Sequence, residues 1–194
     1  DQYIVEELTS LDEFKEKLEK AMSKPKIAFD LIVDSENPLK GNLLGVGFAT
    51  DKYAWGFSIN KEEQEEVFKF LGERLNAKEK KWIFHDAKKN MVFLNRFKKV
   101  SFSDFQDTML AAYLLNPSKG QRSLAEIVLE YLDLPLVEGD NQGRNAGERA
   151  SHLFRLFLAL KEKLIDSKMY DLYKKLELPL TAILSEMEIR GVKL

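Results

Sequence analysis

The sequence predicts an α/β fold, in which a mixed β-sheet has helices on both faces. Two observations lead to this prediction. Three β-rich runs lie within the first 60 residues, at 26–33, 43–50 and 53–59. Segments whose apolar residues recur at helical spacing are interleaved with later short strands and fill the second half of the chain. Strands that come first, with helices interleaved and following, are typical of layered α/β domains.

The N-terminal half predicts alternating helices and strands. Ser10 and Glu13 form a capping-box pattern that opens a helix before the first strand. Only Asp51 and Lys52 separate the second and third β-rich runs, so these runs are expected to form an antiparallel hairpin. The next expected elements are a helix capped by Asn60, a short strand at 81–84, a helix at 88–96 and a short strand at 100–102.

The C-terminal half is expected to be mainly helical. Asp107 caps a helix that ends at Leu115, and Ser123 with Glu126 forms a second capping box. Residues 135–147 carry a proline, three glycines and two asparagines, which indicates a loop. The last two expected elements are a long helix at about 148–165 and a helix at about 168–188 that Pro179 kinks or breaks.

Composition and charge exclude several classes of protein. The 194 residues include 30 basic and 32 acidic side chains, so bulk positive charge for gripping nucleic acid is missing. The chain has no cysteine, which excludes disulfides and thiolate metal sites and fits a reducing cytoplasm. No apolar run suits a membrane span, and the acidic N-terminus does not resemble a signal peptide. We therefore expect a cytoplasmic protein, and the missing initial Met and the abrupt end at Leu194 suggest an excised fragment.

Six segments, in order along the chain, resemble the 3′–5′ exonuclease domain of family A DNA polymerases, the DNA polymerase I family. They are FDLIVDS through NLLG at 29–45, IFHDAKKN at 83–90, DTMLAAYLLNP at 107–117, SLAE with YL at 123–132, GRNAGERA at 143–150, and ELPL through MEIRGV at 177–192. The last segment is similar to the opening of the polymerase domain. The resemblance implies a ribonuclease H-like (DnaQ-type) fold, with an exonuclease-like domain at 1–166 and the start of a polymerase domain at 167–194.

The resemblance also implies a degenerate nuclease site. The family hydrolyses phosphodiesters with two metal ions held by four carboxylates. Asp30 matches one of them, whereas Ile32 stands at the second position and Asn90 at the third. In the last motif, Asn145 replaces a tyrosine and Arg149 replaces the fourth carboxylate. A positive charge opposes metal binding there, so we expect Arg149 to pair with Asp30 and the domain to bind no metal or other cofactor.

The expected function follows from this site. The chain is identified as a catalytically inactive, proofreading-deficient exonuclease-like domain of a DNA polymerase I. It would support template-directed DNA synthesis, in replication and repair, by a Mg²⁺-dependent polymerase domain of the same chain. That domain is the expected partner, DNA contacts are expected to be weak or indirect, and the protein is expected to be a monomer. Two alternatives stay open: an active metal-dependent 3′–5′ exonuclease with rearranged ligands, and a module that binds protein or nucleic acid.

Other polar and aromatic residues are further candidates for a site. A relocated metal site would draw on Asp34, Asp86, Asp104 or Asp107. Asp34 lies about 13 Å from Asp30 along an extended chain, Asp107 is better interpreted as a helix cap, and Asp86 as a turn residue. Structural roles are expected for His85, His152, Trp55 and Trp82, and solvent exposure rather than DNA contact for the lysines of 78–81 and 88–89.

Overall fold

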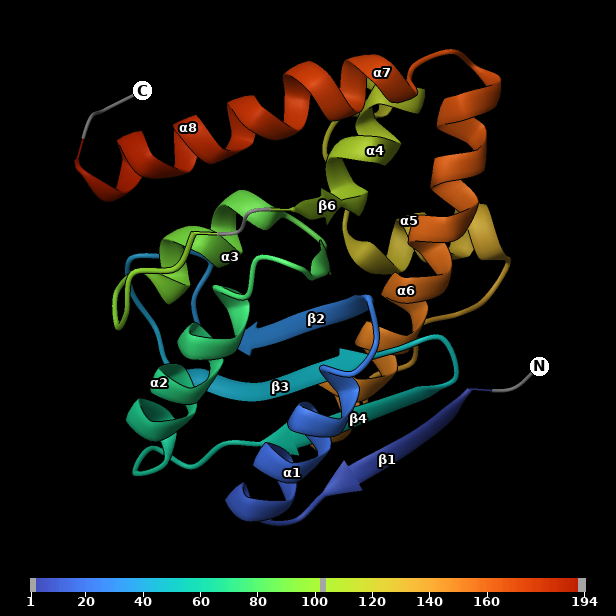
Figure 1. Cartoon of the computed structure of the whole chain (residues 1–194). Helices are drawn as coiled ribbons and strands as arrows, with labels where there is room; N and C mark the ends of the chain where they lie inside the picture. Colours follow the sequence, from blue (N-terminus) through green and yellow to red (C-terminus); the bar gives the residue numbers. More distant parts are fainter. Residues whose placement is uncertain (1–2, 102–103, 192–194) are drawn as a thin grey trace.

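The computed structural model describes residues 3–101 and 104–191, which form a mixed β-sheet flanked by helices (Figure 1). Within these residues the strands are β1 (Ile4–Leu8), β2 (Lys26–Val33), β3 (Leu43–Ala49), β4 (Tyr53–Ser58), β5 (Lys81–Phe84) and β6 (Phe105–Asp107). Their order in the sheet is β1-β4-β3-β2-β5-β6. The pairs β2/β3 and β3/β4 are antiparallel, and the pairs β1/β4, β2/β5 and β5/β6 are parallel. The structure thus confirms the expected mixed sheet with its first hairpin antiparallel.

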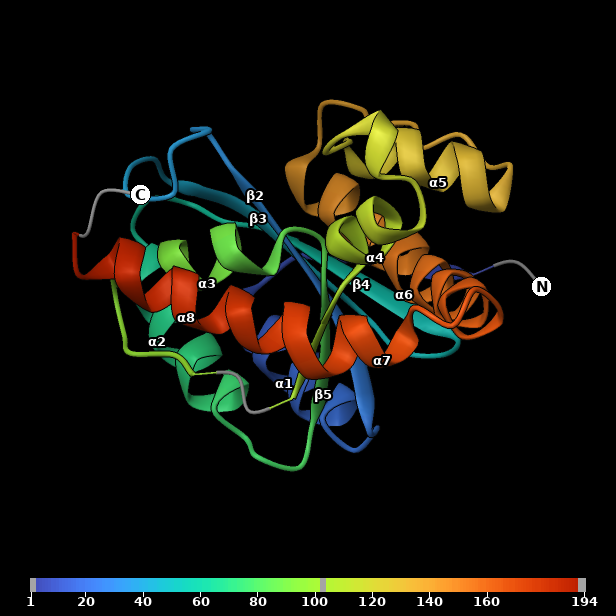
Figure 2. The same ribbon diagram turned by 90° about the horizontal axis from the view of Figure 1, so that it is seen from above.

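The two faces of the sheet differ in the size of their side chains. Large residues alternate with small ones along β2, β3 and β4, and the strand register places Phe29 beside Phe48 and Asp30 beside Gly47. The large face packs on α1 (Leu11–Ala21), whose Phe14 stacks on Phe57 with ring centroids 5.3 Å apart. The small face packs on α6 (Gln142–Asp166). Figure 2 shows α1 and α2 on one side of the sheet and α6 on the other.

Helix α6 touches the sheet backbone to backbone. A Cβ atom added to Gly47 would lie 1.8 Å from the carbonyl oxygen of Ala146. A Cβ atom added to Gly56 would lie 1.8 Å from the carbonyl oxygen of Gly143. Because both distances are far below van der Waals contact, only glycine fits at these positions. The first two turns of α6 are therefore held at a fixed depth against β3 and β4.

This contact explains why α6 begins earlier than expected. The loop prediction holds for 135–141 but was wrong for 142–147, and the helix start near 148 was wrong, because the helix begins at Gln142. The Asn141 side chain caps it by accepting a hydrogen bond from the Arg144 N–H at 2.8 Å. Glycines disfavour a helix in isolation, but here they permit the close approach to the sheet, and tertiary packing decides the outcome.

Three further expectations needed correction. Val100 and Ser101 are not in a strand, and Phe102 lies outside the described residues; the strand of this region is β6, at Phe105–Asp107. Helix α2 (Gln64–Leu75) has Glu63, rather than the expected Asn60, at its N-cap position. Strand β1 was not predicted, because two of its five residues are glutamates. Glu6 is nevertheless well placed at the sheet edge, since it accepts a hydrogen bond from Trp55 Nε1 at 3.0 Å.

The other helix starts follow the predicted caps. Ser10 caps α1, Asp107 caps α4, and Ser123 with Glu126 forms a complete capping box at α5. The helices of this region are α3 (Ala87–Leu94), α4 (Thr108–Leu115), the short 3₁₀ helix η1 (Pro117–Lys119) and α5 (Leu124–Leu132). The two-residue turn at Asp51 and Lys52 is also present, closed by a hydrogen bond from Thr50 N–H to the Tyr53 carbonyl at 2.9 Å.

The C-terminal segment crosses the domain and packs on α3 (Figure 2). It consists of α7 (Tyr170–Leu172), the π-helical turn η2 (Tyr173–Glu177) and α8 (Leu178–Ile189). The expected irregularity at Pro179 therefore takes the form of a widened turn just before the proline, which lacks an N–H and crowds the preceding turn. Tyr173 is fully buried there, and its hydroxyl accepts a hydrogen bond from Asp107 N–H at 2.8 Å.

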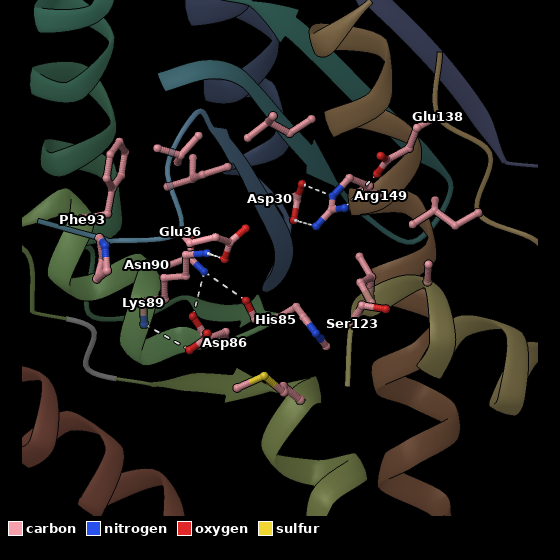
Figure 3. A pocket seen from close by; sticks show the side chains of 18 of the residues that line it. Asp30, Glu36, His85, Asp86, Lys89, Asn90, Phe93, Ser123, Glu138 and Arg149 are labelled. Atoms are coloured by element: carbon pink, nitrogen blue, oxygen red, sulfur yellow. Dashed lines mark hydrogen bonds and ion pairs between the residues drawn. The ribbon is translucent and has the colours of Figure 1, made fainter. Parts of the chain in front are cut away.

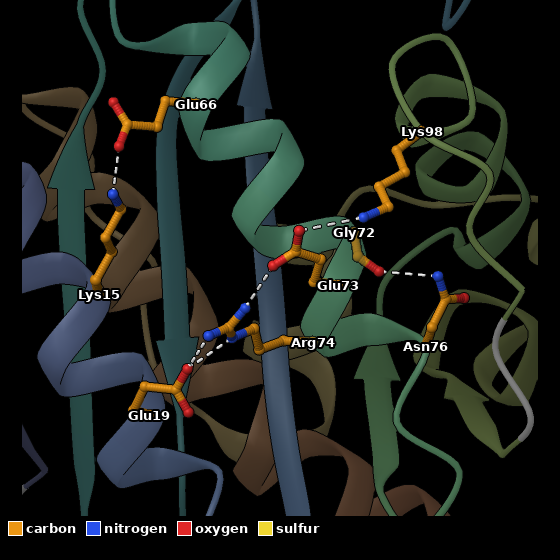
Figure 4. Close-up of polar contacts among 8 residues, drawn as sticks. All are labelled: Lys15, Glu19, Glu66, Gly72, Glu73, Arg74, Asn76 and Lys98. Carbon is orange, nitrogen blue, oxygen red and sulfur yellow. Dashed lines mark hydrogen bonds and ion pairs between the residues drawn. The ribbon is translucent and has the colours of Figure 1, made fainter.

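Ion pairs join α1 to α2 on the large face of the sheet (Figure 4). Lys15 pairs with Glu66, and Arg74 bridges Glu19 and Glu73. The Arg74 guanidinium also lies 3.8 Å from the centre of the Phe70 ring, so it contributes by cation–π attraction as well as by charge. None of the helices in the described residues is long and apolar enough to cross a membrane.

Candidate functional site

A cavity of about 600 Å³ opens beside the carboxyl ends of β2 and β5 (Figure 3). These strands are parallel neighbours, so the residues at and after their ends meet at one edge of the sheet. Helices α3 and α6, the start of α5 and loop residues from 35–38 and 136–138 form further walls. The residues that line it include Asp30, Ile32, His85, Asp86, Asn90 and Arg149.

Asp30 and Arg149 form an ion pair at one end of this cavity. Asp30 lies in β2 and is 6% exposed. Arg149 Nε donates to Asp30 Oδ2 at 2.7 Å, and Arg149 Nη2 donates to Oδ1 at 3.4 Å. Arg149 Nη1 donates to Glu138 Oε1 at 2.8 Å. The adjacent Asp30 carboxylate raises the pKa of Arg149 further above its ordinary value, so the guanidinium is always charged. The expected pairing of Arg149 with Asp30 is present.

Ile32 and Asn90 line the same cavity as the ion pair. Ile32 lies two residues beyond Asp30 on β2, so both side chains share a face of the sheet. Asn90 Nδ2 donates to the backbone carbonyls of His85 at 3.1 Å and Asp86 at 2.9 Å. Its amide therefore stabilises the turn into α3. The structure brings four of the five predicted positions together around one cavity.

Asn145, the fifth position, does not line the cavity. Its side chain is 6% exposed and turns toward the connection between α5 and α6. Oδ1 accepts from the Gly139 N–H at 2.9 Å, and Nδ2 donates to the Gly139 carbonyl at 2.8 Å. The Asn145 amide thus satisfies the N–H and the carbonyl of Gly139 in the way that the backbone of a neighbouring strand would.

The alternative acidic candidates have structural partners. Asp107 caps α4 and also accepts the N–H groups of Asp86 at 3.1 Å and Ala87 at 2.9 Å. Asp86 has a left-handed backbone with φ of 60° and caps α3. Asp34 accepts two hydrogen bonds from Asn42, and Asp104 pairs with Lys81 at 3.7 Å. Across residues 3–101 and 104–191, no three Asp, Glu or His side chains are grouped to hold a metal ion.

Burial controls the titration of the polar groups beneath the cavity. Desolvation lowers the pKa of His85 to about 4, so its imidazole is neutral at pH 7. Its Nδ1 lies 3.0 Å from Thr108 Oγ1 and its Nε2 lies 3.2 Å from the Arg122 carbonyl. Desolvation also raises the pKa of Asp107 to about 6, although four backbone N–H groups favour its ionised form. The pKa of Asp86 is raised by the same cause.

The residues of this cavity do not fit a pair of divalent ions. Such ions bind hard oxygen ligands, chiefly carboxylates, that are free to coordinate. The one carboxylate at a family ligand position, Asp30, is already bonded to a guanidinium, and Ile32 offers no oxygen. Arg149 places a permanent positive charge beside Asp30, where a cation would have to bind. The residues at these family positions therefore do not fit the two-metal site that the resemblance implies.

Several residues of the cavity were not predicted. Glu138 is the second carboxylate on Arg149, but it lies in a loop without periodicity, so its position could not be read from the sequence. Lys89, expected to be solvated, pairs with Glu36 at 2.9 Å across the cavity mouth. The neighbouring Lys88 pairs with Glu188 of α8 at 2.7 Å. Both lysines are partly exposed but have protein partners.

The remaining interpretations agree with the structure. His85 makes the internal hydrogen bonds of a structural residue, although it also lines the cavity. His152 Nδ1 lies 2.8 Å from the Glu148 carbonyl within α6. Trp82 is fully buried and Trp55 is 5% exposed, so both belong to the core of the sheet.

Solved structures share this fold. The POL domain of Pol1 from M. smegmatis, in complex with DNA primer-template and dNTP, superposes with a TM-score of 0.77 over 96% of this chain and 32% of its own, at 23% identity. Brucella melitensis NrnC with bound Mg²⁺ superposes with a TM-score of 0.70 over 98% of this chain and 94% of its own, at 18% identity. At these identities the likeness shows the fold alone, and it confirms the expected ribonuclease H-like architecture.

The sequence comparisons show the family. Residues 29–142 match the family described as DNA polymerase I, ribonuclease H-like domain. DNA polymerase I of Bacillus subtilis (strain 168) is 32% identical over 168 residues, which are 78% of this chain but only 18% of that protein. The chain therefore spans about a fifth of this curated relative. On these matches and on its fold, the chain belongs to the DNA polymerase I family and is similar to the 3′–5′ exonuclease domain of that family.

Proposed function

We propose that this chain is a catalytically inactive 3′–5′ exonuclease-like domain that supports DNA synthesis by a polymerase domain of the same protein. The observation that carries the proposal is the ion pair between Asp30 and Arg149. A buried carboxylate that already has a guanidinium partner gains little electrostatic stabilisation from a metal ion. Breaking the pair would leave both charges without a partner. The domain then serves as a scaffold, and the chemistry belongs to the parent DNA-directed DNA polymerase, which uses Mg²⁺ in its own domain.

The C-terminal segment supports a polymerase domain as the partner. Only Leu178 and Ser185 of α8 are buried among its described residues, whereas Leu180 is 47% and Ile183 is 56% exposed. Leu176, in the preceding turn, is 62% exposed. These residues recur at a spacing of three to four and form an apolar stripe, which is typical of a helix that packs on a further domain. We assign 167–194 to the start of that domain and 1–166 to the exonuclease-like domain.

The charge of the domain bears on its contact with DNA in the parent protein. With nearly balanced charge, this domain would contact DNA weakly or through its neighbour, in a cytoplasmic, monomeric polymerase that acts in replication and repair.

A nuclease assay tests the proposal directly. The chain is incubated with end-labelled single-stranded DNA and either Mg²⁺ or Mn²⁺, beside a family exonuclease that retains all four carboxylates. We expect no shortening of the DNA by this chain under conditions in which the reference enzyme degrades it. Degradation that the Asp30→Ala variant abolishes would overturn the proposal and establish an active nuclease with rearranged ligands.

Metal binding is tested separately by thermal unfolding. An ion that bound the native state at ten times its Kd would add about 1.4 kcal/mol to the free energy of unfolding. We expect the Tm to be the same in 10 mM Mg²⁺, 10 mM Mn²⁺ and EDTA at matched ionic strength. A rise in Tm with Mn²⁺ that Asp30→Ala removes would show a metal site at this carboxylate.

A further inference from the structure

Residues 133–141, called the strap here, connect α5 to α6 along the cavity. Leu136 and Glu138 of the strap form part of the cavity wall. Leu134 and Leu136 are partly buried against the hydrophobic core, whereas Val137 is 74% exposed. The strap has no hydrogen-bonded secondary structure between the end of α5 and the cap of α6. Side chains must therefore hold it in place.

Two residues of α6 hold the strap by specific contacts. The Asn145 side chain pairs with both backbone groups of Gly139, as described above, at 2.9 and 2.8 Å. Arg149 Nη1 holds Glu138 at 2.8 Å, while the other side of the guanidinium holds Asp30. Figure 3 shows Arg149 between Glu138 of the strap and Asp30 of β2. The strap is thereby tied both to a helix and to the central sheet.

These two holding residues share one face of α6. Asn145 and Arg149 are four positions apart, so their side chains lie one turn apart along the same side of the helix. They are also the two positions at which the last motif of the resembled family carries its tyrosine and its carboxylate. The same backbone positions that would support metal chemistry in the family hold a loop in this chain.

We propose that the strap is a lid over the Asp30 end of the cavity, and that Asn145 and Arg149 are its two latches. This inference rests on the proposed function only in that Asn145 and Arg149 take no part in hydrolysis. The latches differ in kind: Asn145 makes a neutral, buried pair, and Arg149 makes a charged pair with a half-exposed carboxylate. Glu138, the carboxylate of the strap that lines the cavity, adds a negative charge there that disfavours a nucleic acid backbone.

Hydrogen exchange of backbone amides tests the lid, because the Gly139 N–H is protected only while the Asn145 latch is closed. The chain offers a matched control. Asn95 makes the same kind of pair with Val100 in another loop, donating to its carbonyl at 3.0 Å and accepting from its N–H at 3.2 Å. The variants are therefore Asn145→Ala, Glu138→Gln and, as the control, Asn95→Ala.

We expect Asn145→Ala to speed exchange at Gly139 by about tenfold or more, because the variant removes both hydrogen bonds to this residue and one hydrogen bond of ordinary strength already corresponds to roughly tenfold. We expect Asn95→Ala to speed exchange at Val100 and to leave Gly139 unchanged. Glu138→Gln should speed exchange across the strap by about two- to fivefold at low salt, with a smaller effect at high salt, because an exposed ion pair is screened.

The lid is refuted if Gly139 exchanges at the wild-type rate in both Asn145→Ala and Glu138→Gln. It is also refuted if Asn95→Ala speeds exchange at Gly139 as much as Asn145→Ala does, because exchange at Gly139 would then depend only on the overall stability of the fold. Should Asn145→Ala fail to fold, Glu138→Gln decides the question, because its side chain is 47% exposed and its loss does not disturb the core. Exchange rates are independent of DNA hydrolysis, so this test and the nuclease assay can fail separately.

Discussion

The contact between Gly47 and helix α6 gives the sharpest stability prediction. In Gly47→Ala the new Cβ would lie 1.8 Å from the Ala146 carbonyl oxygen, 2.1 Å from its carbon and 2.7 Å from the Gly147 nitrogen. All three are backbone atoms, so no rotamer change relieves the overlap. The helix must move away by more than 1 Å to bring these atoms to an ordinary van der Waals distance from the new Cβ.

The magnitude follows from the size of this displacement. Overpacking a core by one methyl group typically costs about 1–3 kcal/mol, and contact with rigid backbone places this case at the upper end. Gly47 is paired in register with Asp30, so the same shift pulls Arg149 away from its carboxylate. We therefore expect a loss of about 3 kcal/mol or more, which corresponds to a fall in Tm of roughly 6–12 °C for a chain of this size.

Urea unfolding and thermal melts of two alanine variants provide the assay. Gly139→Ala is the control, because an added Cβ there meets nothing within 4 Å and its backbone is not in the left-handed region. We expect its free energy of unfolding to remain within about 0.5 kcal/mol of wild type. A Gly47→Ala protein that melts within 2 °C of wild type would refute the backbone contact between α6 and the sheet.

Two further predictions concern the buried polar groups. Because burial lowers the pKa of His85 from 6.5 to about 4, its neutral form stabilises the fold above pH 6.5, and this stability is lost as pH falls toward 4, by roughly 3 kcal/mol. The raised pKa of Asp107 gives the opposite trend below pH 6, but Asp107 is present in both wild type and His85→Gln, so its effect cancels in their comparison. The difference in free energy of unfolding between these two proteins should therefore shrink as pH falls. A constant difference would contradict the assignment to His85. Tyr173→Phe removes the acceptor for the buried Asp107 N–H and should cost about 1–3 kcal/mol in urea unfolding, whereas Tyr113→Phe, at an exposed tyrosine, should cost almost nothing. Equal stability of the two phenylalanine variants would argue against the Tyr173 contact.

Local rules predicted most of the fold. The caps at Ser10, Asp107 and Ser123 mark helix starts correctly, because a capping side chain bonds to backbone only two or three residues away. The failures occur where distant contacts decide. Residues 142–147 contain two glycines and look like a loop, but their packing on the sheet makes them helical. Strand β1 depends on its pairing with β4, because its two glutamates interrupt the apolar pattern of its own five residues.

The candidate site was predicted to a similar extent. Alternation along β2 correctly places Asp30 and Ile32 on one face, and the resemblance correctly brings Asn90 and Arg149 to the same cavity. The role of Asn145 was not predictable, because its partner, Gly139, lies in a loop whose path depends on that very contact. Glu138 was missed for the same reason. Residues that meet through a loop leave no periodic signal in a sequence.

The small face of the sheet fixes the backbone geometry of this site independently of the side chains that set its chemistry. Glycines fix where α6 crosses the strands, so the backbone of residue 149 stands opposite that of residue 30 whatever side chains they carry. Exchanging a carboxylate for a guanidinium at residue 149 then changes the reactivity of the cavity while the scaffold around it is preserved. A site built in this way can change its chemistry without loss of the folded domain.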